Sequence, residues 1–116
     1  MSEAARKAAE NYITAINTKD IDLMLGTFAQ DGELIHPFGN FKGQDALRGF
    51  YADLVFKADT ILSKGLMAVE GNVAIVEVAG VSPQKPNEPQ YACDVFNVNG
   101  EGRIETLAIY YRNMLS

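Results

Sequence analysis

Apolar residues near the start of the chain recur every three or four positions, the periodicity of an amphipathic helix. Asn17 to Asp20 interrupts this pattern, and Asp20 can cap a second, shorter helix over residues 21–28. A third amphipathic helix is predicted over residues 44–56, where apolar side chains again mark one face. The apolar positions of the first helix are Ala5, Ala8, Ala9, Tyr12, Ile13 and Ile16.

The segment between the second and third helices predicts a turn and a short strand. Residues 29–32, AQDG, have the composition of a turn, and the strand that follows ends at His36. Pro37 restricts the residue before it to extended geometry, so His36 should lie at a fixed strand end.

From residue 60 onward the pattern is typical of β-strands. Gly71-Asn72 predicts one hairpin turn and residues 99–102, NGEG, a second. Residues 83–89, PQKPNEP, predict a loop, because the segment is polar and broken by prolines. The predicted strands cover residues 60–70, 73–82, 90–98 and 103–112.

Helices followed by a run of antiparallel strands indicate an α+β fold. We expect a strongly curved antiparallel sheet cupping three N-terminal helices in a cone-shaped domain. Such a sheet would enclose an apolar pocket, and pockets of this kind are favoured sites for small molecules. The chain has 116 residues, which suggests a single domain over residues 1–116.

Composition and charge narrow the range of partners. The chain is 47% hydrophobic and 22% charged, ordinary values for a soluble globular protein. Its net charge of -5, without any run of Lys or Arg, argues against nucleic acids and anionic membranes, because phosphate binding needs clustered cations. No stretch approaches the roughly 18 apolar residues of a membrane helix, and the charged, alanine-rich N-terminal segment does not predict a signal peptide.

The counts of cysteine and histidine bear on location and on metal chemistry. Cys93 is the only cysteine, so no internal disulfide forms and a reducing cytoplasm is the expected location. With one histidine, His36, and one cysteine, a zinc site of the usual kind would lack ligands. We therefore expect no metal site and no cofactor.

Asp94 lies within an otherwise apolar strand. Side chains alternate between the two faces of a strand, which places Asp94 between Ala92 and Phe96. If that face is interior, the ionised carboxylate is costly and tends to take up a proton, becoming a hydrogen-bond donor. If the sheet is turned over, Asp94 lies in water or in an ion pair. The strand alone leaves both readings open.

Tyr12 has a similar ambiguity, since it belongs to the apolar stripe of the first helix. It can be a packing residue with its hydroxyl at the edge of the core. A tyrosine and a protonated aspartate that converge on one point would instead form an oxyanion hole, with both donors directed at an oxygen that gains charge.

The segment from Tyr12 to about Val55, which contains NTKDID, FAQDG and FYADL, resembles the first half of a ketosteroid isomerase. The resemblance returns at residues 93–111, CDVFNVNGEGRIETLAIYY, whereas the segment between agrees only in strand pattern. Ketosteroid isomerases belong to the nuclear transport factor 2-like superfamily, which also contains polyketide cyclases, dehydratases and epoxide hydrolases. The fold that this resemblance implies is a curved sheet over helices, often paired as a homodimer through the outer face of the sheet.

The resemblance also implies roles for three residues. Tyr12 matches the oxyanion-hole tyrosine and Asp94 the aspartic acid held protonated by an apolar site, an arrangement for which ketosteroid isomerase is a standard case. The position of the family's proton-transferring aspartate is occupied by His36. An imidazole with a pKa near 6.5 is competent to remove a proton next to a carbonyl, and it is mostly neutral at pH 7.

The function expected on this basis is isomerisation of a small apolar carbonyl compound through an enolate. Tyr51, Phe50 and Phe96 are further candidates for substrate contact, and the Tyr51 hydroxyl could support Tyr12. Three alternatives stay open: an ion pair between Asp94 and His36, a pocket that binds a hydrophobic molecule without transforming it, and a protein-interaction module that uses the sheet face.

Overall fold

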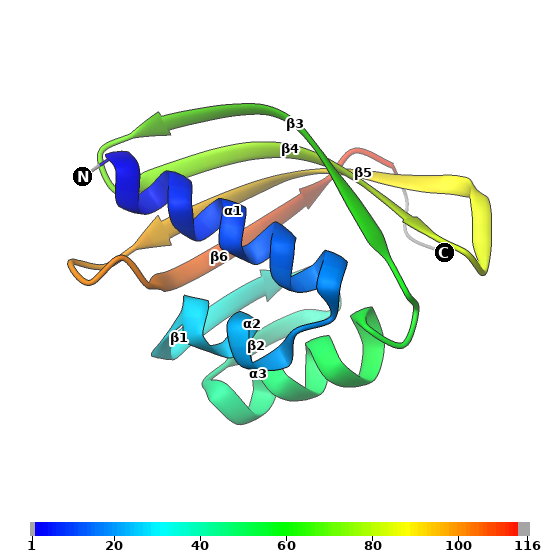
Figure 1. The fold of residues 1–116 in the computed structure, drawn as a ribbon, viewed down its shortest axis with the longest axis horizontal. Coiled ribbons are helices and arrows are strands. Elements are labelled where there is room, and N and C mark those ends of the chain that lie inside the picture. The colour runs from blue at the N-terminus through cyan, green and yellow to red at the C-terminus, as the bar shows by residue number, and fades with distance from the viewer. Residues whose placement is uncertain (1, 114–116) are drawn as a thin grey trace.

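The computed structural model describes residues 2–113 and consists of helices packed on one face of a six-stranded sheet. Figure 1 shows α1 lying across the concave face of the sheet, with α2 and α3 below it. The α+β fold with three N-terminal helices and a curved sheet is therefore confirmed. The elements are α1 (Ser2–Thr18), α2 (Ile21–Thr27), β1 (Phe28–His36), β2 (Gly39–Lys42), α3 (Gln44–Phe50), a short π-helix (Tyr51–Val55), β3 (Ile61–Glu70), β4 (Val73–Ser82), β5 (Lys85–Val98) and β6 (Ile104–Tyr111).

The sheet is mixed, which differs from the expectation of a wholly antiparallel one. Its strand order is β2-β1-β6-β5-β4-β3, and β1 runs parallel to its neighbour β6. The other neighbouring pairs are antiparallel. The parallel pair joins strands far apart in the chain, and it brings the end of β1, with His36, beside the end of β6.

The helices bury the faces that their periodicity predicts. Small side chains on the buried stripe of α1, such as Ala8 and Ala9, let the helix approach the sheet closely, and Tyr12 lies on the same stripe. Asp20 caps α2 as predicted, because its side chain accepts a hydrogen bond from the backbone N–H of Leu23 at 3.0 Å.

Two segments predicted as turn or loop are strands. Residues 29–32 belong to β1, where the pairing with β6 shifts register between Phe28 and Glu33. A Cβ on Gly32 would lie 2.7 Å from the carbonyl oxygen of Ile104, so this glycine permits close approach of two backbones rather than a turn.

The predicted loop at residues 83–89 is also wrong, because β5 already begins at Lys85. The pairing of β5 with β6 ends at Ala92 and Tyr111, and Arg112 and Asn113 then hydrogen-bond to Tyr91 and Pro89. The remainder of this end of β5 lies beside β4. Proline has no N–H to donate, so it is tolerated on a strand where no neighbouring strand needs that hydrogen bond. Figure 1 shows this β4–β5 extension projecting from the body of the molecule.

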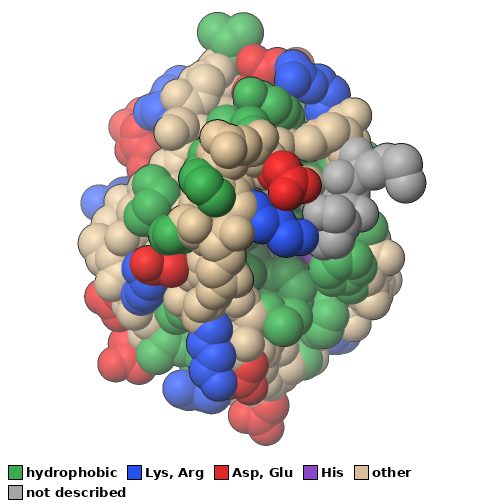
Figure 2. Space-filling view, turned by 90° about the vertical axis from the view of Figure 1, so that its right-hand side faces the viewer, with side chains coloured by type: hydrophobic (Ala, Val, Ile, Leu, Met, Phe, Trp, Pro, Cys, Tyr) green, Lys and Arg blue, Asp and Glu red, His purple; other side chains and the backbone are tan. Residues whose placement is uncertain are grey.

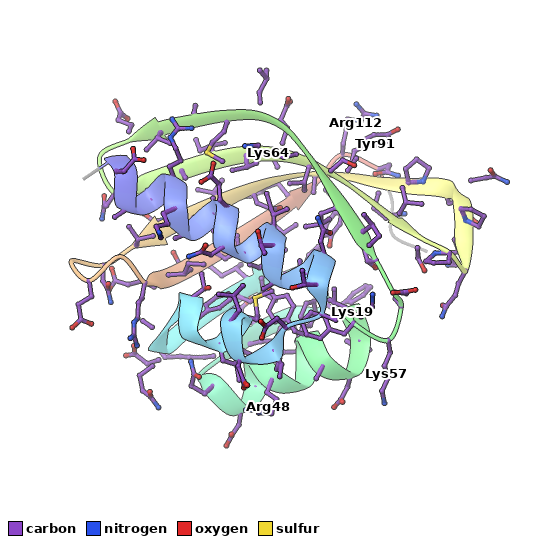
Figure 3. The ribbon with its side chains drawn as sticks, viewed as in Figure 1. Lys19, Arg48, Lys57, Lys64, Tyr91 and Arg112 are labelled. Atoms are coloured by element: carbon purple, nitrogen blue, oxygen red, sulfur yellow. The ribbon has the colours of Figure 1, made fainter. Side chains whose placement is uncertain are left out.

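Positive charge is dispersed over the surface. Lys19, Arg48, Lys57, Lys64 and Arg112 lie around different sides of the molecule in Figure 3. Arg112 covers the ring of Tyr91, with its guanidinium carbon 4.1 Å from the ring centroid. Among residues 2–113, no helix has the length and hydropathy needed to cross a membrane.

Candidate active site

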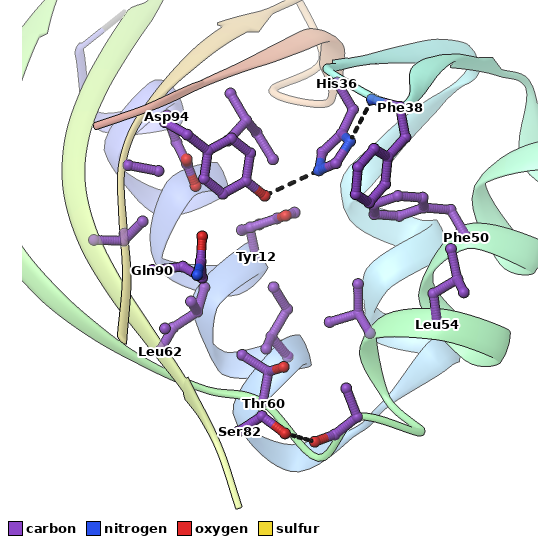
Figure 4. Close-up of a pocket in the computed structure, with 18 of the residues that line it drawn as sticks. Tyr12, His36, Phe38, Phe50, Leu54, Thr60, Leu62, Ser82, Gln90 and Asp94 are labelled. Carbon is purple, nitrogen blue, oxygen red and sulfur yellow. Dashed lines mark hydrogen bonds between the residues drawn. The ribbon is translucent and has the colours of Figure 1, made fainter. Parts of the chain in front are cut away.

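A cavity of about 310 Å³ lies between the concave face of the sheet and the helices. Figure 2 shows its mouth as a hollow with hydrophobic side chains along its wall. Figure 4 shows the polar side chains that enter it from different elements. The lining includes the apolar residues Ile16, Phe38, Phe50, Leu54, Leu62, Val78 and Ile109, and the polar residues Tyr12, His36, Gln90, Asp94 and Tyr111.

Asp94 lies on the concave face of the sheet, so the structure decides between the two readings of its strand. It pairs in register with Val76 of β4 and Ile109 of β6, and only 2% of its surface is exposed. Its Oδ1 atom is buried without a hydrogen-bond partner among the described residues. Burial raises the pKa of Asp94 from 3.8 to about 7. The carboxyl therefore holds its proton far more readily than a solvated one.

Tyr12 enters the pocket from α1 and is supported by a second tyrosine. Its hydroxyl lies 2.8 Å from that of Tyr51, a hydrogen bond between residues 39 positions apart. The Tyr12 ring packs edge-on against Phe28, Tyr51 and Phe96. Burial, and then the neighbouring Tyr51 and Asp94, raise the pKa of Tyr12 well above its usual value. Tyr12 is thus a neutral hydroxyl held in place by aromatic contacts.

His36 is held by hydrogen bonds at both of its ring nitrogens. The backbone N–H of Phe38 donates to Nδ1 at 3.1 Å, and Nε2 lies 2.9 Å from the Tyr111 hydroxyl. Because Nδ1 accepts, the proton of the neutral ring is on Nε2 and is donated to Tyr111. The Tyr111 hydroxyl is then able to donate its own proton elsewhere. Burial lowers the pKa of His36 below 6.5, which favours this neutral form.

The structure gives no support to an ion pair between His36 and Asp94. The ring nitrogens of His36 bond to Phe38 and Tyr111, and the Oδ1 atom of Asp94 has no partner among the described residues. An ion pair would lower the pKa of the aspartate and raise that of the histidine. The shifts have the opposite signs, because burial dominates at both groups.

Of the three residues predicted to contact the substrate, one lines the cavity and two lie behind it. Phe50 lines the cavity, where its ring packs against His36 with centroids 5.0 Å apart. Tyr51 and Phe96 are fully buried and are not among the lining residues. Both contact Tyr12 from behind, so the structure places them as supports of Tyr12.

Tyr111 and Gln90 are polar residues of the pocket that were not among the predicted site residues. Tyr111 faces inward on β6 while its neighbour Tyr110 is 63% exposed, and strand alternation alone indicates only that one of the two is inside. Gln90 shares the face of Asp94 on β5, a relationship that the same alternation shows. Among the described residues, no cluster of three His, Cys, Asp or Glu side chains could hold a metal ion.

Solved structures of low sequence identity share this fold. A protein from Kribbella flavida assigned as a ketosteroid isomerase is 16% identical, with a TM-score of 0.85 over 99% of this chain and 82% of that one. One from Sinorhizobium meliloti assigned as a polyketide cyclase is 22% identical, with a TM-score of 0.80 over 89% and 93%. The epoxide hydrolase/cyclase-like enzyme SalBIII is 19% identical, with a TM-score of 0.81 over 94% and 91%. No curated protein matches the chain in sequence.

A curved sheet that encloses a pocket over three helices defines the nuclear transport factor 2-like class of domain, as the resemblance implied. Within that class the SnoaL-like domain model matches residues 9–106. The chain belongs to the SnoaL-like family. The fold of this family hosts isomerases and cyclases, so the reaction has to be argued from the pocket itself.

Proposed function

We propose that this protein is an isomerase that moves a proton on a small, largely apolar carbonyl compound through an enolate. The observation that carries the proposal is the buried Oδ1 of Asp94, which has no hydrogen-bond partner among the described residues and belongs to an apolar cavity. A protonated carboxyl at this place is a donor for an oxygen that gains negative charge. Such donors act most strongly where water is excluded.

Tyr12 is the second proposed donor to the substrate oxygen. Its hydroxyl is hydrogen-bonded to the hydroxyl of Tyr51. When Tyr51 is the donor in this bond, the Tyr12 proton is free to be donated to a ligand. Hydrogen bonds in such a chain strengthen one another. The two tyrosines and Asp94 then stabilise the enolate without any of them becoming ionised.

His36 is the proposed proton acceptor. Its lone pair is on Nδ1 and faces the N–H of Phe38, so acceptance of a proton requires this hydrogen bond to open. Phe38 belongs to the short turn between β1 and β2 and is 67% exposed, which makes a small movement of the turn feasible. The same nitrogen can return the proton to another carbon and complete the isomerisation.

The proposal is tested by the conversion of 3-cyclohexen-1-one into its conjugated isomer, followed by the absorbance of the product. We expect catalysis by the wild type, a loss of at least roughly 10²-fold in His36→Ala, and a loss of similar size in Asp94→Asn. Gln84→Leu, an exposed change in the β4–β5 turn, is the control with an unchanged rate. A His36→Ala variant as active as the wild type would remove His36 from the mechanism.

Non-catalytic binding of a small hydrophobic molecule is the outcome favoured if the wild type has no isomerase activity. In that case a bound apolar compound copurifies with the protein, and proton exchange at carbon is absent.

We further propose that the protein is a homodimer in the cytoplasm, paired through the outer face of the sheet.

A further inference from the structure

Gln90 lies on the same wall of the cavity as Asp94. Like Asp94, it has a buried side-chain oxygen that lacks a hydrogen-bond partner among the described residues. The two residues are four positions apart on β5, so their side chains leave the same face of the strand, roughly 13 Å apart along it. Figure 4 shows the amide of Gln90 directed into the pocket between Asp94 and Leu62. Its Oε1 atom is buried, and no described residue donates a hydrogen bond to it.

The neighbours of Gln90 in the pocket explain why this amide lacks a partner. Across the sheet it pairs in register with Gly80, which has no side chain, and its nearest neighbour on the same face of β5 is Ala92. Leu62 lines the same wall of the cavity. None of these three positions offers a polar side chain, and the buried Oε1 has no partner among the described residues, so the amide is available to a molecule that enters the cavity.

We propose that Gln90 forms a second polar subsite, and that the substrate is a carbonyl compound with a second oxygen function. This proposal rests on the proposed function, because Asp94 is taken to bind the carbonyl oxygen. An amide both donates and accepts, so a hydroxyl group, which does the same, satisfies it fully. The ligand class is then a hydroxy-ketone or hydroxy-enone with its two oxygens along one edge.

The opposite side of the cavity fits the remainder of such a molecule. Phe50, Leu54 and Val55, from the third helix and the π-helix after it, offer only apolar surface there. A ligand with oxygens on one edge and hydrocarbon on the other therefore matches both walls. A ketone with a single oxygen leaves Gln90 unsatisfied, and this difference is the basis of discrimination between the two substrates.

The test compares 2-naphthol with a panel of dihydroxynaphthalenes of different oxygen spacing, each titrated by fluorescence. In the wild type we expect at least one dihydroxynaphthalene to bind roughly 3- to 10-fold more tightly than 2-naphthol. Gln90→Met, which keeps the length of the side chain, and Gln90→Leu should reduce this ratio to near one. Gln84→Leu is the matched control, and it should keep the wild-type ratio.

The outcomes separate this inference from the function on which it rests. If 2-naphthol binds in an Asp94-dependent way but no dihydroxynaphthalene gains affinity, the subsite is wrong and the proposed function stands. A gain that survives in both Gln90 variants also overturns the subsite. If the wild type binds no naphthol at all, the oxyanion site is wrong, and the subsite falls with it.

Discussion

The Nε2 atom of His36 lies 2.9 Å from the hydroxyl oxygen of Tyr111, across 75 positions of the chain. The contact exists because β1 and β6 run parallel and end at the same edge of the sheet. Together with the Phe38 N–H on Nδ1, it fixes which nitrogen of the ring carries the proton. His36 is therefore a donor to Tyr111 in this arrangement, and it becomes a base only when Nδ1 is released.

The tautomer of His36 is the first prediction. At pH 8, nitrogen NMR of the ring should show a protonated Nε2 and an unprotonated Nδ1. The same tautomer should persist in Tyr111→Phe, because the Phe38 N–H still occupies Nδ1. A proton on Nδ1 in the wild type would contradict the assignment. It would also place the lone pair on Nε2, where the hydrogen bond to Tyr111, and not the one to the turn, would have to open for His36 to act as the base.

The pH dependence of isomerase activity is the second prediction. His36 has to be neutral to accept a proton, so kcat/KM rises with pH through a pKa below 6.5. Asp94 has to be protonated to donate, so kcat/KM falls again through a pKa of about 7. The expected profile is a narrow bell. An activity that rises through about pH 7 and stays high would instead assign the base to the ionised form of Asp94.

The stability of the protein should depend on pH through Asp94. Its folded-state pKa of about 7 lies above the unfolded value of 3.8, so between these values the folded protein binds more protons than the unfolded one. The contribution of this group to the free energy of unfolding thus decreases as pH rises from about 4 to 7, by up to roughly 4 kcal/mol.

Asp94→Asn has no such titration, which makes it the matched comparison. Relative to the wild type, its free energy of unfolding should increase between about pH 4 and pH 7 and then level off, when measured by urea denaturation at each pH. A difference between the two proteins that stays constant over this range would show that Asp94 is not desolvated in the folded state.

The outer face of the sheet supplies a prediction about assembly. Ile75, Val95, Ala108 and Ile35 pair in register across β4, β5, β6 and β1, which makes an apolar row on the side away from the helices. Ile75 and Ile35 are 41% and 40% exposed. A dimer through this face should dissociate in Ile75→Lys and persist in Thr14→Lys, a control on the exposed side of α1. Sedimentation at micromolar concentration measures both, and a monomeric wild type would contradict the dimer.

Local patterns in the sequence predicted the helices, both hairpin turns and the shared face of Ala92, Asp94 and Phe96 on β5, although they did not decide whether that face points inward. Each of these depends on residues close together in the chain, such as the cap at Asp20 or the alternation around Asp94. The parallel pairing of β1 with β6 is not visible in this way, because no local pattern encodes a contact between strands so far apart. Strand β2, only four residues long, was not predicted for lack of a clear pattern.

In the candidate site, too, some residues could be predicted from the sequence, whereas contacts between distant elements could not. Tyr12, His36 and Asp94 line one cavity, and the resemblance to ketosteroid isomerases was sufficient to select them. Tyr111 could not be selected, because the register of β6 decides which of two adjacent tyrosines faces inward. The hydrogen bonds on His36 were equally beyond the sequence, since one comes from the backbone of a turn and the other from the end of a distant strand.

The oxyanion site is the central claim, and the ionisation of bound 2-naphthol tests it most directly. Wild type and Asp94→Asn are titrated at pH 6, where Asp94 of the wild type is mostly protonated, and the absorbance and fluorescence of the bound naphthol are recorded. We predict that the wild type binds it with spectra shifted toward those of the naphtholate, and that Asp94→Asn binds it at least roughly tenfold more weakly. Equal affinity and unshifted spectra in the two proteins would show that Asp94 is not a donor to bound oxygen.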